Sequence, residues 1–404
     1  MKRESVRATL LLAGEVYTPR RRIRRGGLVI QGRKILYGGP AAGAFGFAER
    51  LHDRSRAFAL EVLEFADAIA VPGLVDIHLH GGNGADFMDG RPEAAAAALA
   101  CHLRDGTTSV LATVMTAGHE DILRAIASVR RAVEEKAVFP EVLGIHLEGP
   151  YLAREKAGAQ PAAHIRPFAP SEMKAYLDAS RGTVRIATLA PETKGSSKLI
   201  ALLKKRGIVA AAGHSKATFA QARDGIRRGI RHGTHLFNAM SGVFHRDPGL
   251  AGALLLDDAV SVELIADGFH VHPAVLELVL RLKPFRKVVL VSDATRRAGL
   301  ADRPLRTARG KLYGSSITLI QAVRNLAAWT RLPFTEILAM ATENPAEVVG
   351  AEKRKGRLAR GFDADIVLLD RRLRVRKIFL SGTELQKKIY RNNITSLTVS
   401  GECC

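Results

Sequence analysis

The sequence predicts an α/β protein, in which a TIM (β/α)8 barrel is joined to a small β-sandwich domain. Eight short, apolar and β-branched runs alternate with segments of helical periodicity, which is typical of βα units around a parallel sheet. No GxGxxG motif follows the first run, so the repeats favour a closed barrel over an open doubly wound sheet. Alternating apolar residues broken by Gly-rich turns precede this region and return after it. We therefore expect the small domain at residues 1–70 and 357–404, and the barrel at residues 71–356.

The elements follow in order along the chain. Segments 8–17, 26–39 and 61–73 read as antiparallel strands, and segment 364–382 returns to pair with them. Helices are expected at residues 91–106 and 119–136, the second with acidic residues in its first turn. The eight predicted barrel strands are residues 71–77, 107–114, 141–148, 183–190, 207–214, 233–237, 259–267 and 287–294.

Composition excludes several classes of protein. The chain has 404 residues, of which 47% are hydrophobic and 25% charged, as expected of a globular protein. No apolar run approaches the length of a membrane span, and residues 8–14 form too short a stretch for a signal peptide. Three cysteines, Cys101, Cys403 and Cys404, suggest no disulfide framework. We expect a cytoplasmic protein without a membrane partner.

The formal net charge of +21 raises the question of a nucleic-acid partner. Basic residues gather at 19–25, 352–360 and 371–377, but none of these clusters has interleaved aromatic residues, and only 5% of the chain is aromatic. Base stacking on single strands requires such aromatic side chains. We therefore predict solvated basic faces with a mild attraction for anionic substrates, and no nucleic-acid partner.

Chemically versatile side chains stand at the ends of the predicted strands. In a TIM barrel the active site lies at the carboxyl ends of the strands. His78 and His80 are two residues apart at the end of the first strand, so both imidazoles leave the strand on one face. The other strands end in Glu148, His214, His235, Asp267 followed by His270, and Asp293.

Any one of these residues alone fits a structural role, but the barrel brings them to one cavity. Imidazole nitrogen and carboxylate oxygen together suit Zn²⁺ or another divalent first-row ion, and a catalytic site leaves one position open for water. Such an ion activates water and polarises a carbonyl, so we predict hydrolysis with Asp293 as the base. The histidines without this position are predicted to be structural: His102, His119, His164, His232, His245 and His272.

A set of motifs spread over most of the chain resembles one superfamily. The motifs are PGLVDIHLHG (72–81), HLEGPYL (146–152), AGHS (212–215), THLFNAM (234–240), ADGFHVH (266–272), VSDAT (291–295), GSS (314–316), NPA (344–346) and GFDADIVLLD (361–370). They resemble the amidohydrolase superfamily, and HLEGP with THLFNAM resembles its N-acetylglucosamine-6-phosphate deacetylase subgroup.

This resemblance implies a role for each residue. Glu148, His214 and His235 are the implied principal metal ligands, and His78 and His80 are the implied pair for a second ion. The implied cofactor is one or two divalent ions, with zinc first and iron, manganese or cobalt as alternatives. Asp293 is the implied catalytic acid/base. The implied substrate-binding residues are Ala159, Gln160, Asn238, Ala239, Arg246, His270, Leu312, Tyr313 and Gly314, with Arg246 suited to phosphate.

Three details modify the inference. Dihydroorotase-like and hydantoinase-like members use a carboxylated lysine where this chain has Glu148, so ring-opening activities are not expected. Gln160 stands where many subgroup members have a histidine that polarises the acetyl carbonyl, and an amide donates a hydrogen bond without a titratable charge. Segment 294–313 is shorter than the family pattern, so we expect an abbreviated surface element there.

The leading functional hypothesis is metal-dependent deacetylation of N-acetylglucosamine 6-phosphate in amino-sugar catabolism. The alternatives are the N-acetylgalactosamine 6-phosphate epimer, another N-acyl compound, and a sugar-phosphate-binding protein without turnover. A nucleic-acid-associated basic protein is a further reading, which rests on charge alone. The resemblance also implies a homo-oligomer, either a dimer or a tetramer.

Overall fold

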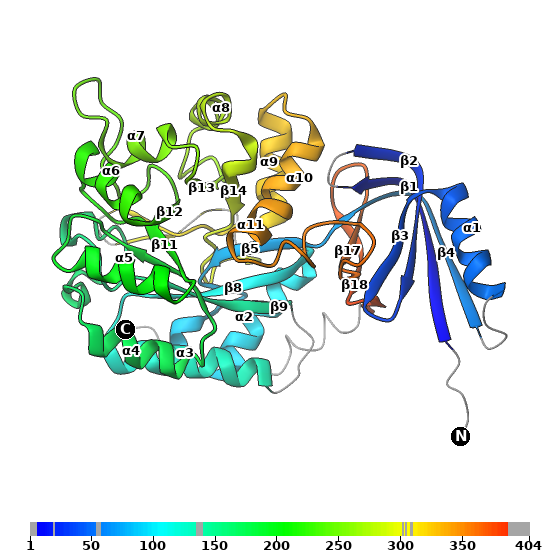
Figure 1. Cartoon of the computed structure of the whole chain (residues 1–404), viewed down its shortest axis with the longest axis horizontal. Helices are drawn as coiled ribbons and strands as arrows, with labels where there is room; N and C mark the ends of the chain where they lie inside the picture. The colour runs from blue at the N-terminus through cyan, green and yellow to red at the C-terminus, as the bar shows by residue number, and fades with distance from the viewer. Residues whose placement is uncertain are drawn as a thin grey trace.

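In the computed structural model, a closed barrel lies beside a smaller curled sheet (Figure 1). The structure describes residues 6–18, 21–53, 58–134, 140–300, 303, 305–307 and 310–386. The predicted TIM barrel is confirmed, with all of its strands parallel and adjacent in chain order. These strands are β5 (Leu74–Leu79), β8 (Thr107–Met115), β9 (Glu141–Glu148), β10 (Val184–Leu189), β11 (Val209–Ala212), β12 (Ile230–Gly233), β13 (Ser261–Ile265) and β14 (Val288–Val291).

The first and last strands close the barrel just beyond their carboxyl ends. Leu79 and Ala294 form a parallel bridge, the His80 amide donates to the Ala294 carbonyl at 2.7 Å, and the Asp293 amide donates to the His78 carbonyl at 2.9 Å. The backbone that closes the barrel therefore also carries three of the predicted site residues.

A helix follows each barrel strand, so the layers are those of a (β/α)8 barrel. These helices are α2 (Pro92–Arg104), α3 (His119–Glu134), α4 (Pro170–Ala179), α5 (Ser196–Lys205), α6 (Phe219–Arg228), α7 (Gly249–Leu256), α8 (Pro273–Leu282) and α9 (Leu319–Trp329). Two more, α10 (Phe334–Met340) and α11 (Glu343–Val348), follow α9. Ala346 of α11 joins the apolar cluster inside the barrel, so this helix covers the end opposite to the predicted site.

The sixth strand lies earlier than the sequence predicted. We expected residues 233–237, but β12 ends at Gly233. Beyond it, His235 and Phe237 have φ angles of +29° and +74°, which a β-strand cannot contain. The apolar residues Leu236 and Phe237 therefore belong to a turn above the barrel, and their hydrophobicity reflects packing there rather than a strand.

The terminal segments form a separate sheet, as predicted, although its details differ. Its order is β19-β18-β17-β4-β1-β2-β3, and it is one continuous curled sheet rather than the two facing sheets of a sandwich. The curl brings β3 to segment 361–364, where the Ile35 amide donates to the Phe362 carbonyl at 2.9 Å. The bounds are β1 (Val6–Thr18), β2 (Arg21–Gln31), β3 (Lys34–Pro40), β4 (Phe58–Pro72), β17 (Ile366–Leu369), β18 (Val375–Leu380) and β19 (Thr383–Glu384).

Helix α1 (Ala41–Asp53) was not expected in this domain. It packs Ala44 and Ala48 on the outer face of the sheet and carries the chain from β3 across to β4. Because of this crossover, β4 pairs parallel to β1, whereas the sequence suggested only antiparallel neighbours. The expected domain boundaries at residues 71 and 357 stay a prediction; residues 1–5 and 387–404, which include Cys403 and Cys404, lie outside the described residues.

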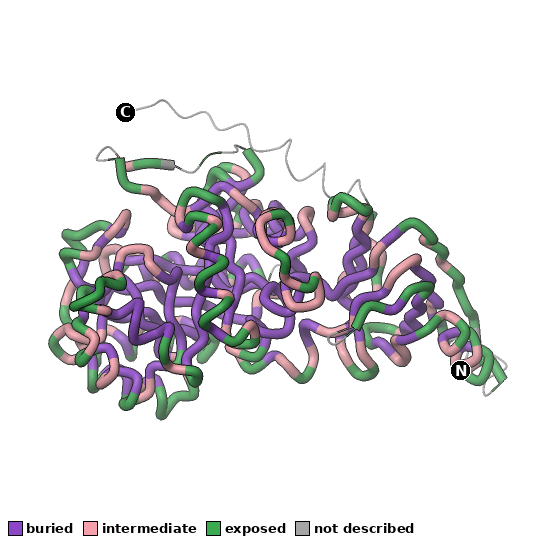
Figure 2. The backbone as a smooth tube through the Cα atoms, turned by 90° about the horizontal axis from the view of Figure 1, so that it is seen from above, coloured by how far each residue is buried: buried purple, intermediate pink, exposed green. Residues whose placement is uncertain are grey.

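Burial follows the two sheets, as Figure 2 shows, with buried residues inside the barrel and inside the curled sheet. Charged residues join the two parts: Lys355 is almost fully buried and lies 2.7 Å from Glu141, 3.0 Å from Asp363 and 2.6 Å from Asp365. Among the helices of the described residues, none combines the length and the apolar character needed to cross a membrane.

Candidate active site

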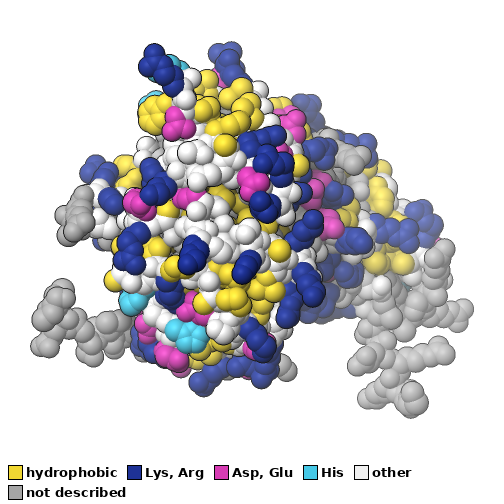
Figure 3. Space-filling model, turned by 60° about the vertical axis from the view of Figure 1, so that its left-hand side comes forward, with side chains coloured by type: hydrophobic (Ala, Val, Ile, Leu, Met, Phe, Trp, Pro, Cys, Tyr) yellow, Lys and Arg dark blue, Asp and Glu magenta, His cyan; other side chains and the backbone are white. Residues whose placement is uncertain are grey.

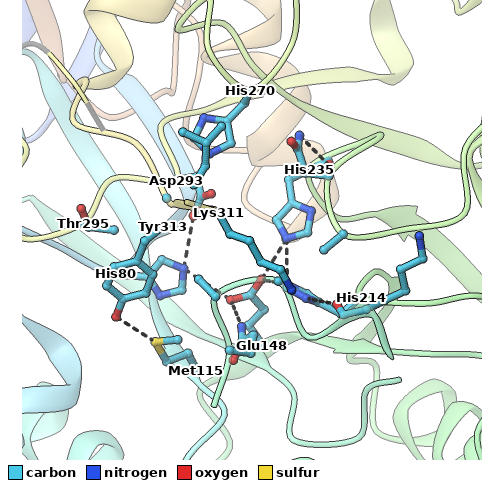
Figure 4. Close-up of a pocket in the computed structure, with 18 of the residues that line it drawn as sticks. His80, Met115, Glu148, His214, His235, His270, Asp293, Thr295, Lys311 and Tyr313 are labelled. Carbon is cyan, nitrogen blue, oxygen red and sulfur yellow. Dashed lines mark hydrogen bonds and ion pairs between the residues drawn. The ribbon is translucent and has the colours of Figure 1, made fainter. Parts of the chain in front are cut away.

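A cavity of about 430 Å³ opens at the carboxyl ends of the barrel strands (Figure 4). Nearly all of the predicted site residues line it. The lining consists of His80, Met115, Glu148, Glu155, Lys156, Gly158, Ala159, Gln160, His214, His235, Asn238, Ala239, His270, Asp293, Thr295, Lys311, Leu312, Tyr313 and Gly314.

Three of the predicted site residues have the same unusual backbone conformation, with a positive φ angle. His214, His235 and Asp293 each lie two residues beyond the end of their strands, β11, β12 and β14. Each has a positive φ, of 46°, 29° and 47°, a region in which L-residues cost of order 1–3 kcal/mol. The turn bends the backbone as it leaves each strand, and the side chains reach the cavity. Strain of this kind is concentrated at functional sites.

Glu148, the last residue of β9, lies at the centre of the site. Its Oε1 is 2.9 Å from His214 Nε2 and 3.1 Å from His235 Nε2, and these two nitrogens are 3.0 Å apart. Figure 4 shows all three side chains converging from the ends of β9, β11 and β12. His214 is oriented by its other nitrogen, since Nδ1 lies 3.0 Å from the Lys156 carbonyl oxygen.

A second group lies beside the first, on the strands that close the barrel. His80 Nε2 is 3.2 Å from Asp293 Oδ1 and 3.4 Å from Glu148 Oε2. His78 Nε2 is 3.5 Å from the same Asp293 oxygen and 3.7 Å from Glu148 Oε1. The predicted convergence of His78 and His80 on one face is therefore realised.

The charges in this cluster depend on one another. Burial alone would raise the pKa of Glu148, but His78, His214 and His235 outweigh it and hold the pKa well below its usual value. Burial would likewise raise the pKa of Asp293, and His78 and His80 reverse this effect, so its pKa is lowered. Both carboxylates are thus ionised and available as a ligand or a base.

The donor set fits a divalent ion. Glu148, His214 and His235 form one group whose ligand atoms all lie within 4.8 Å of one another, and His78, His80 and Asp293 form another. His78 Nε2 is buried and has no hydrogen-bond partner among the described residues, although burial of an unpaired nitrogen is costly. Nitrogen and oxygen donors that meet at such distances are suited to zinc and its neighbours in the first row.

Gln160 contacts the predicted metal-ligand group directly. Its Nε2 donates to Glu148 Oε2 at 2.6 Å, and its Oε1 accepts from the Thr116 amide at 2.9 Å. Only 6% of the residue is exposed. The amide is therefore held between the end of β8 and Glu148, and it orients the carboxylate.

The other predicted binding residues are also placed at the cavity, with one exception. Asn238 donates through Nδ2 to the carbonyl oxygens of His235 and Leu236, at 3.2 Å each, which stabilises the turn after β12. Burial would lower the pKa of His270, but Asp267 at 2.7 Å outweighs it and raises the pKa. Arg246, in contrast, is exposed and does not line the cavity, because the loop before α7 carries it to the outer surface.

Two lysines line the cavity that were not predicted from the sequence to be site residues. Lys156 and Lys311 both line the cavity and give it positive charge, whereas sequence reasoning assigned that role to Arg246. Segment 294–313, which we expected to be abbreviated, contains a hairpin between β15 (Leu305–Arg306) and β16 (Leu312–Tyr313), and Lys311 precedes its second strand. No motif marked either lysine, because surface lysines are common throughout this chain.

The model of the amidohydrolase family matches residues 69–403, which is more than half of the sequence. The chain belongs to the amidohydrolase family. Hydrolytic chemistry and a divalent metal come with this family, and the ligand geometry described above agrees with both.

Relatives in this family share most of the chain. N-acetylglucosamine-6-phosphate deacetylase of Bacillus subtilis is 37% identical over 77% of this chain and 83% of its own length. N-acetylgalactosamine-6-phosphate deacetylase of Escherichia coli O157:H7 is 34% identical over 80% and 89%. A solved structure of the Mycobacterium smegmatis N-acetyl-D-glucosamine-6-phosphate deacetylase, in complex with N-acetyl-D-glucosamine-6-phosphate, is 35% identical, covers 93% of this chain and 99% of its own, and has a TM-score of 0.83.

Proposed function

We propose that this amidohydrolase removes the acetyl group of N-acetyl-D-glucosamine 6-phosphate, giving D-glucosamine 6-phosphate and acetate in amino-sugar catabolism. One observation carries the proposal: Asp293 and a complete His/Glu ligand set meet at the floor of a cavity that also holds lysines. Relatives named as deacetylases of this substrate, with 33% to 37% identity over most of the chain, support it.

We assign metal binding and proton transfer to different residues of the site. Glu148, His214 and His235 would hold one divalent ion, and His78 with His80 would hold a second. When bound, the metal lowers the pKa of water and polarises the acetyl carbonyl. Asp293 accepts the proton of the attacking water at Oδ1 and delivers it to the amide nitrogen as the C–N bond breaks. The products are the free amine and acetate.

The cavity offers cations for a phosphorylated sugar. Lys156, Lys311 and His270 line it, and the pKa of His270 is raised, which favours its charged form. Compact ammonium groups bind phosphate as point charges. We expect these groups to hold the 6-phosphate and the hydroxyls, whereas the exposed position of Arg246 gives it no contact with this cavity within one chain.

A second substrate deserves a direct comparison. The Escherichia coli relative named for N-acetylgalactosamine 6-phosphate is about as similar as those named for the glucosamine compound. The two sugars differ at a single hydroxyl. We propose the glucosamine substrate first and its epimer as the alternative.

Acetate release from N-acetylglucosamine 6-phosphate by purified protein tests the proposal. Turnover is expected to disappear after chelation and to return with added zinc. Zinc content measured on the same sample gives one or two ions per chain. The matched substrates are N-acetylglucosamine without phosphate, expected to react poorly, and N-acetylgalactosamine 6-phosphate, whose kcat/KM decides the epimer.

Two results would contradict the proposal. Binding of the sugar phosphate by zinc-loaded protein without any acetate release would make the chain a binding protein. Faster turnover of the galactosamine epimer would move the substrate assignment to that sugar. Zinc as the ion, a dimer or tetramer, and a cytoplasmic location stay predictions, which metal analysis, sedimentation equilibrium and cell fractionation check.

A further inference from the structure

A carboxylate that does not line the cavity lies directly behind the predicted metal ligands. Glu263 is the central residue of β13 (Ser261–Ile265), between Val262 and Leu264, and its exposed fraction is 0%. Burial of an ionised carboxylate is costly unless each oxygen is paired. The partners of Glu263 therefore indicate why this strand carries a charge.

Those partners are two metal-site histidines and a third histidine. Glu263 Oε2 lies 2.8 Å from His78 Nδ1 and accepts from the His235 amide at 2.9 Å. Its other oxygen, Oε1, lies 3.0 Å from His232 Nε2. His232 is in turn fixed by Ser261, whose Oγ is 2.7 Å from His232 Nδ1. Both carboxylate oxygens are thus used.

The contact with His78 decides which nitrogen of that ring faces the metal site. A carboxylate at Nδ1 requires a proton on Nδ1, and the neutral ring then presents the lone pair of Nε2. That nitrogen is buried, has no hydrogen-bond partner in the part of the chain that the structure describes, and lies 3.5 Å from Asp293 and 3.7 Å from Glu148. Metal-bound histidines commonly have a carboxylate on the opposite nitrogen.

The contact with the His235 amide acts on the backbone. His235 has a φ of +29°, and its side chain reaches Glu148 only because the chain turns here. The hydrogen bond to Glu263 holds the amide at this strained turn. One oxygen atom therefore orients a ligand from β5 and a ligand that follows β12.

We propose that Glu263 is a positioning residue that holds His78 and His235 in register for metal binding, with His232 fixing the carboxylate. The inference rests on the metal site of the proposed function, but not on its substrate. Glu263 is absent from the cavity wall, so it acts through the ligands rather than on the sugar.

Zinc affinity, measured by competition with a chromogenic chelator, tests this role without any substrate. We expect Glu263→Gln to bind zinc 10- to 100-fold more weakly, because it removes the negative charge behind His78 and replaces the oxygen that faces His232 by an amide donor. The amide oxygen can still accept from His78 and His235, so the fold is expected to persist. Asp365→Asn is the matched control, because Asp365 is also buried and pairs with Lys355, away from the metal site.

A second variant leaves the ligand contacts in place. His232→Leu removes the partner of Oε1 only, and we expect a smaller loss of zinc affinity than in Glu263→Gln. The visible spectrum of the Co²⁺-loaded protein adds a geometric readout, which should change in both variants and stay unchanged in Asp365→Asn. Circular dichroism checks that all three remain folded.

Several outcomes would overturn the role. Zinc affinity equal to that of the unaltered protein in Glu263→Gln, or an equal loss in Asp365→Asn, would reduce Glu263 to a structural residue. His78, His146 and Glu263 also form a possible ligand group. If Glu263→Gln bound one zinc ion fewer per chain and kept its affinity for the other ion, Glu263 would be a metal ligand rather than a positioning residue. Normal zinc binding by an unaltered protein that releases no acetate would count against the proposed function alone.

Discussion

The two oxygens of the Glu148 carboxylate have different neighbours. Oε1 faces His214 and His235, and Oε2 receives the Gln160 amide and lies near His80. Because the Glu148 carboxylate is fixed in this way, its Oε1 stays directed toward His214 and His235. Gln160 therefore orients a predicted metal ligand, which is a different task from polarising the acetyl group of a substrate.

Gln160→Leu should weaken both the fold and the metal site. The variant leaves the Thr116 amide and Glu148 Oε2 without their partner, and an unsatisfied buried group costs about 1–3 kcal/mol. We expect the unfolding free energy to fall by this amount in urea titration, together with weaker zinc binding. Gln160→Glu keeps the size and the acceptor for Thr116 but brings a second charge to Glu148. If both variants bind zinc normally, Gln160 does not orient the ligand.

Asp293→Asn should remove the acid/base group while preserving the shape of the site. General acid–base catalysis contributes roughly 10²- to 10⁴-fold, so we expect kcat to fall by that factor. Zinc content should stay close to that of the unaltered protein if Glu148, His214 and His235 hold the principal ion. A loss of metal in parallel with activity would instead identify Asp293 chiefly as a ligand.

The sequence pointed to the candidate site residues at or just beyond the strand ends, and it gave little sign of the buried carboxylate in the middle of β13. His214, His235 and Asp293 were visible because a barrel gathers its strand ends. Glu263 stands in the middle of an apolar run, and the signal it gave was a single charge in a strand that is otherwise buried. Arg246 was assigned through the family resemblance, and the structure shows that its side chain is exposed.

At the level of elements, the barrel repeats were predictable, but local boundaries were not. Alternating strand and helix patterns predicted all eight βα units, whereas the apolar residues after Gly233 resembled a strand and form a turn. Helix α1, AAGAFGFAERLHD, is rich in Ala and Gly and gave no clear start signal. Its position was set by the need to cross the curled sheet, which is a tertiary effect.

The junction between β9 and the segment before β17 depends on Lys355. Lys355→Met should be strongly destabilising, since Glu141, Asp363 and Asp365 then lose their shared buried cation. Breaking a buried pair on one side costs about 3–5 kcal/mol. Lys377→Met is the control, because Lys377 is half-exposed and its pair with Glu384 is worth about 1 kcal/mol or less. Similar melting temperatures for the two variants would show that the cluster adds little.

The same junction predicts a pH dependence. Burial opposes ionisation of Asp363, but Lys34, Lys355 and Arg354 outweigh it and lower its pKa to about 2. An unfolded Asp has a pKa of about 3.9, so the stabilisation is complete above that pH and is lost as the pH falls toward 2. We expect the difference in unfolding free energy between the unaltered protein and Asp363→Asn to be large at pH 6 and to shrink below pH 4. A difference that is constant from pH 6 to pH 3 would contradict this assignment.

For the whole molecule, metal binding and stability should be linked. Any ligand that binds only the folded state adds stability, by about 4 kcal/mol at a concentration 1,000-fold above its dissociation constant. We expect chelation to lower the melting temperature, and added zinc to raise it in a concentration-dependent manner. Calcium, which prefers oxygen ligands, serves as the control ion. A melting temperature that changes neither with chelation nor with added zinc would show that metal binding does not stabilise the fold.

On the face that Figure 3 shows, the basic side chains are spread out rather than concentrated. Figure 3 shows Lys and Arg side chains spread over one face, with Asp and Glu among them. Several of the basic residues form pairs along helices, such as Lys174 with Asp178 and Arg228 with Asp224. We expect the net charge of +21 to favour the approach of anionic substrates.

The place where the barrel closes has a consequence for biosynthesis. Glu148, His214 and His235 come from strands that a ribosome delivers in sequence, but His78 and His80 meet Asp293 only after the last strand has been made. Glu148, His214 and His235 are therefore all synthesised before Asp293, the residue that His78 and His80 contact after β14. The contacts of His78 and His80 with Asp293 are therefore completed only when the last barrel strand has been made, so synthesis of β14 sets the earliest point at which this part of the site can form.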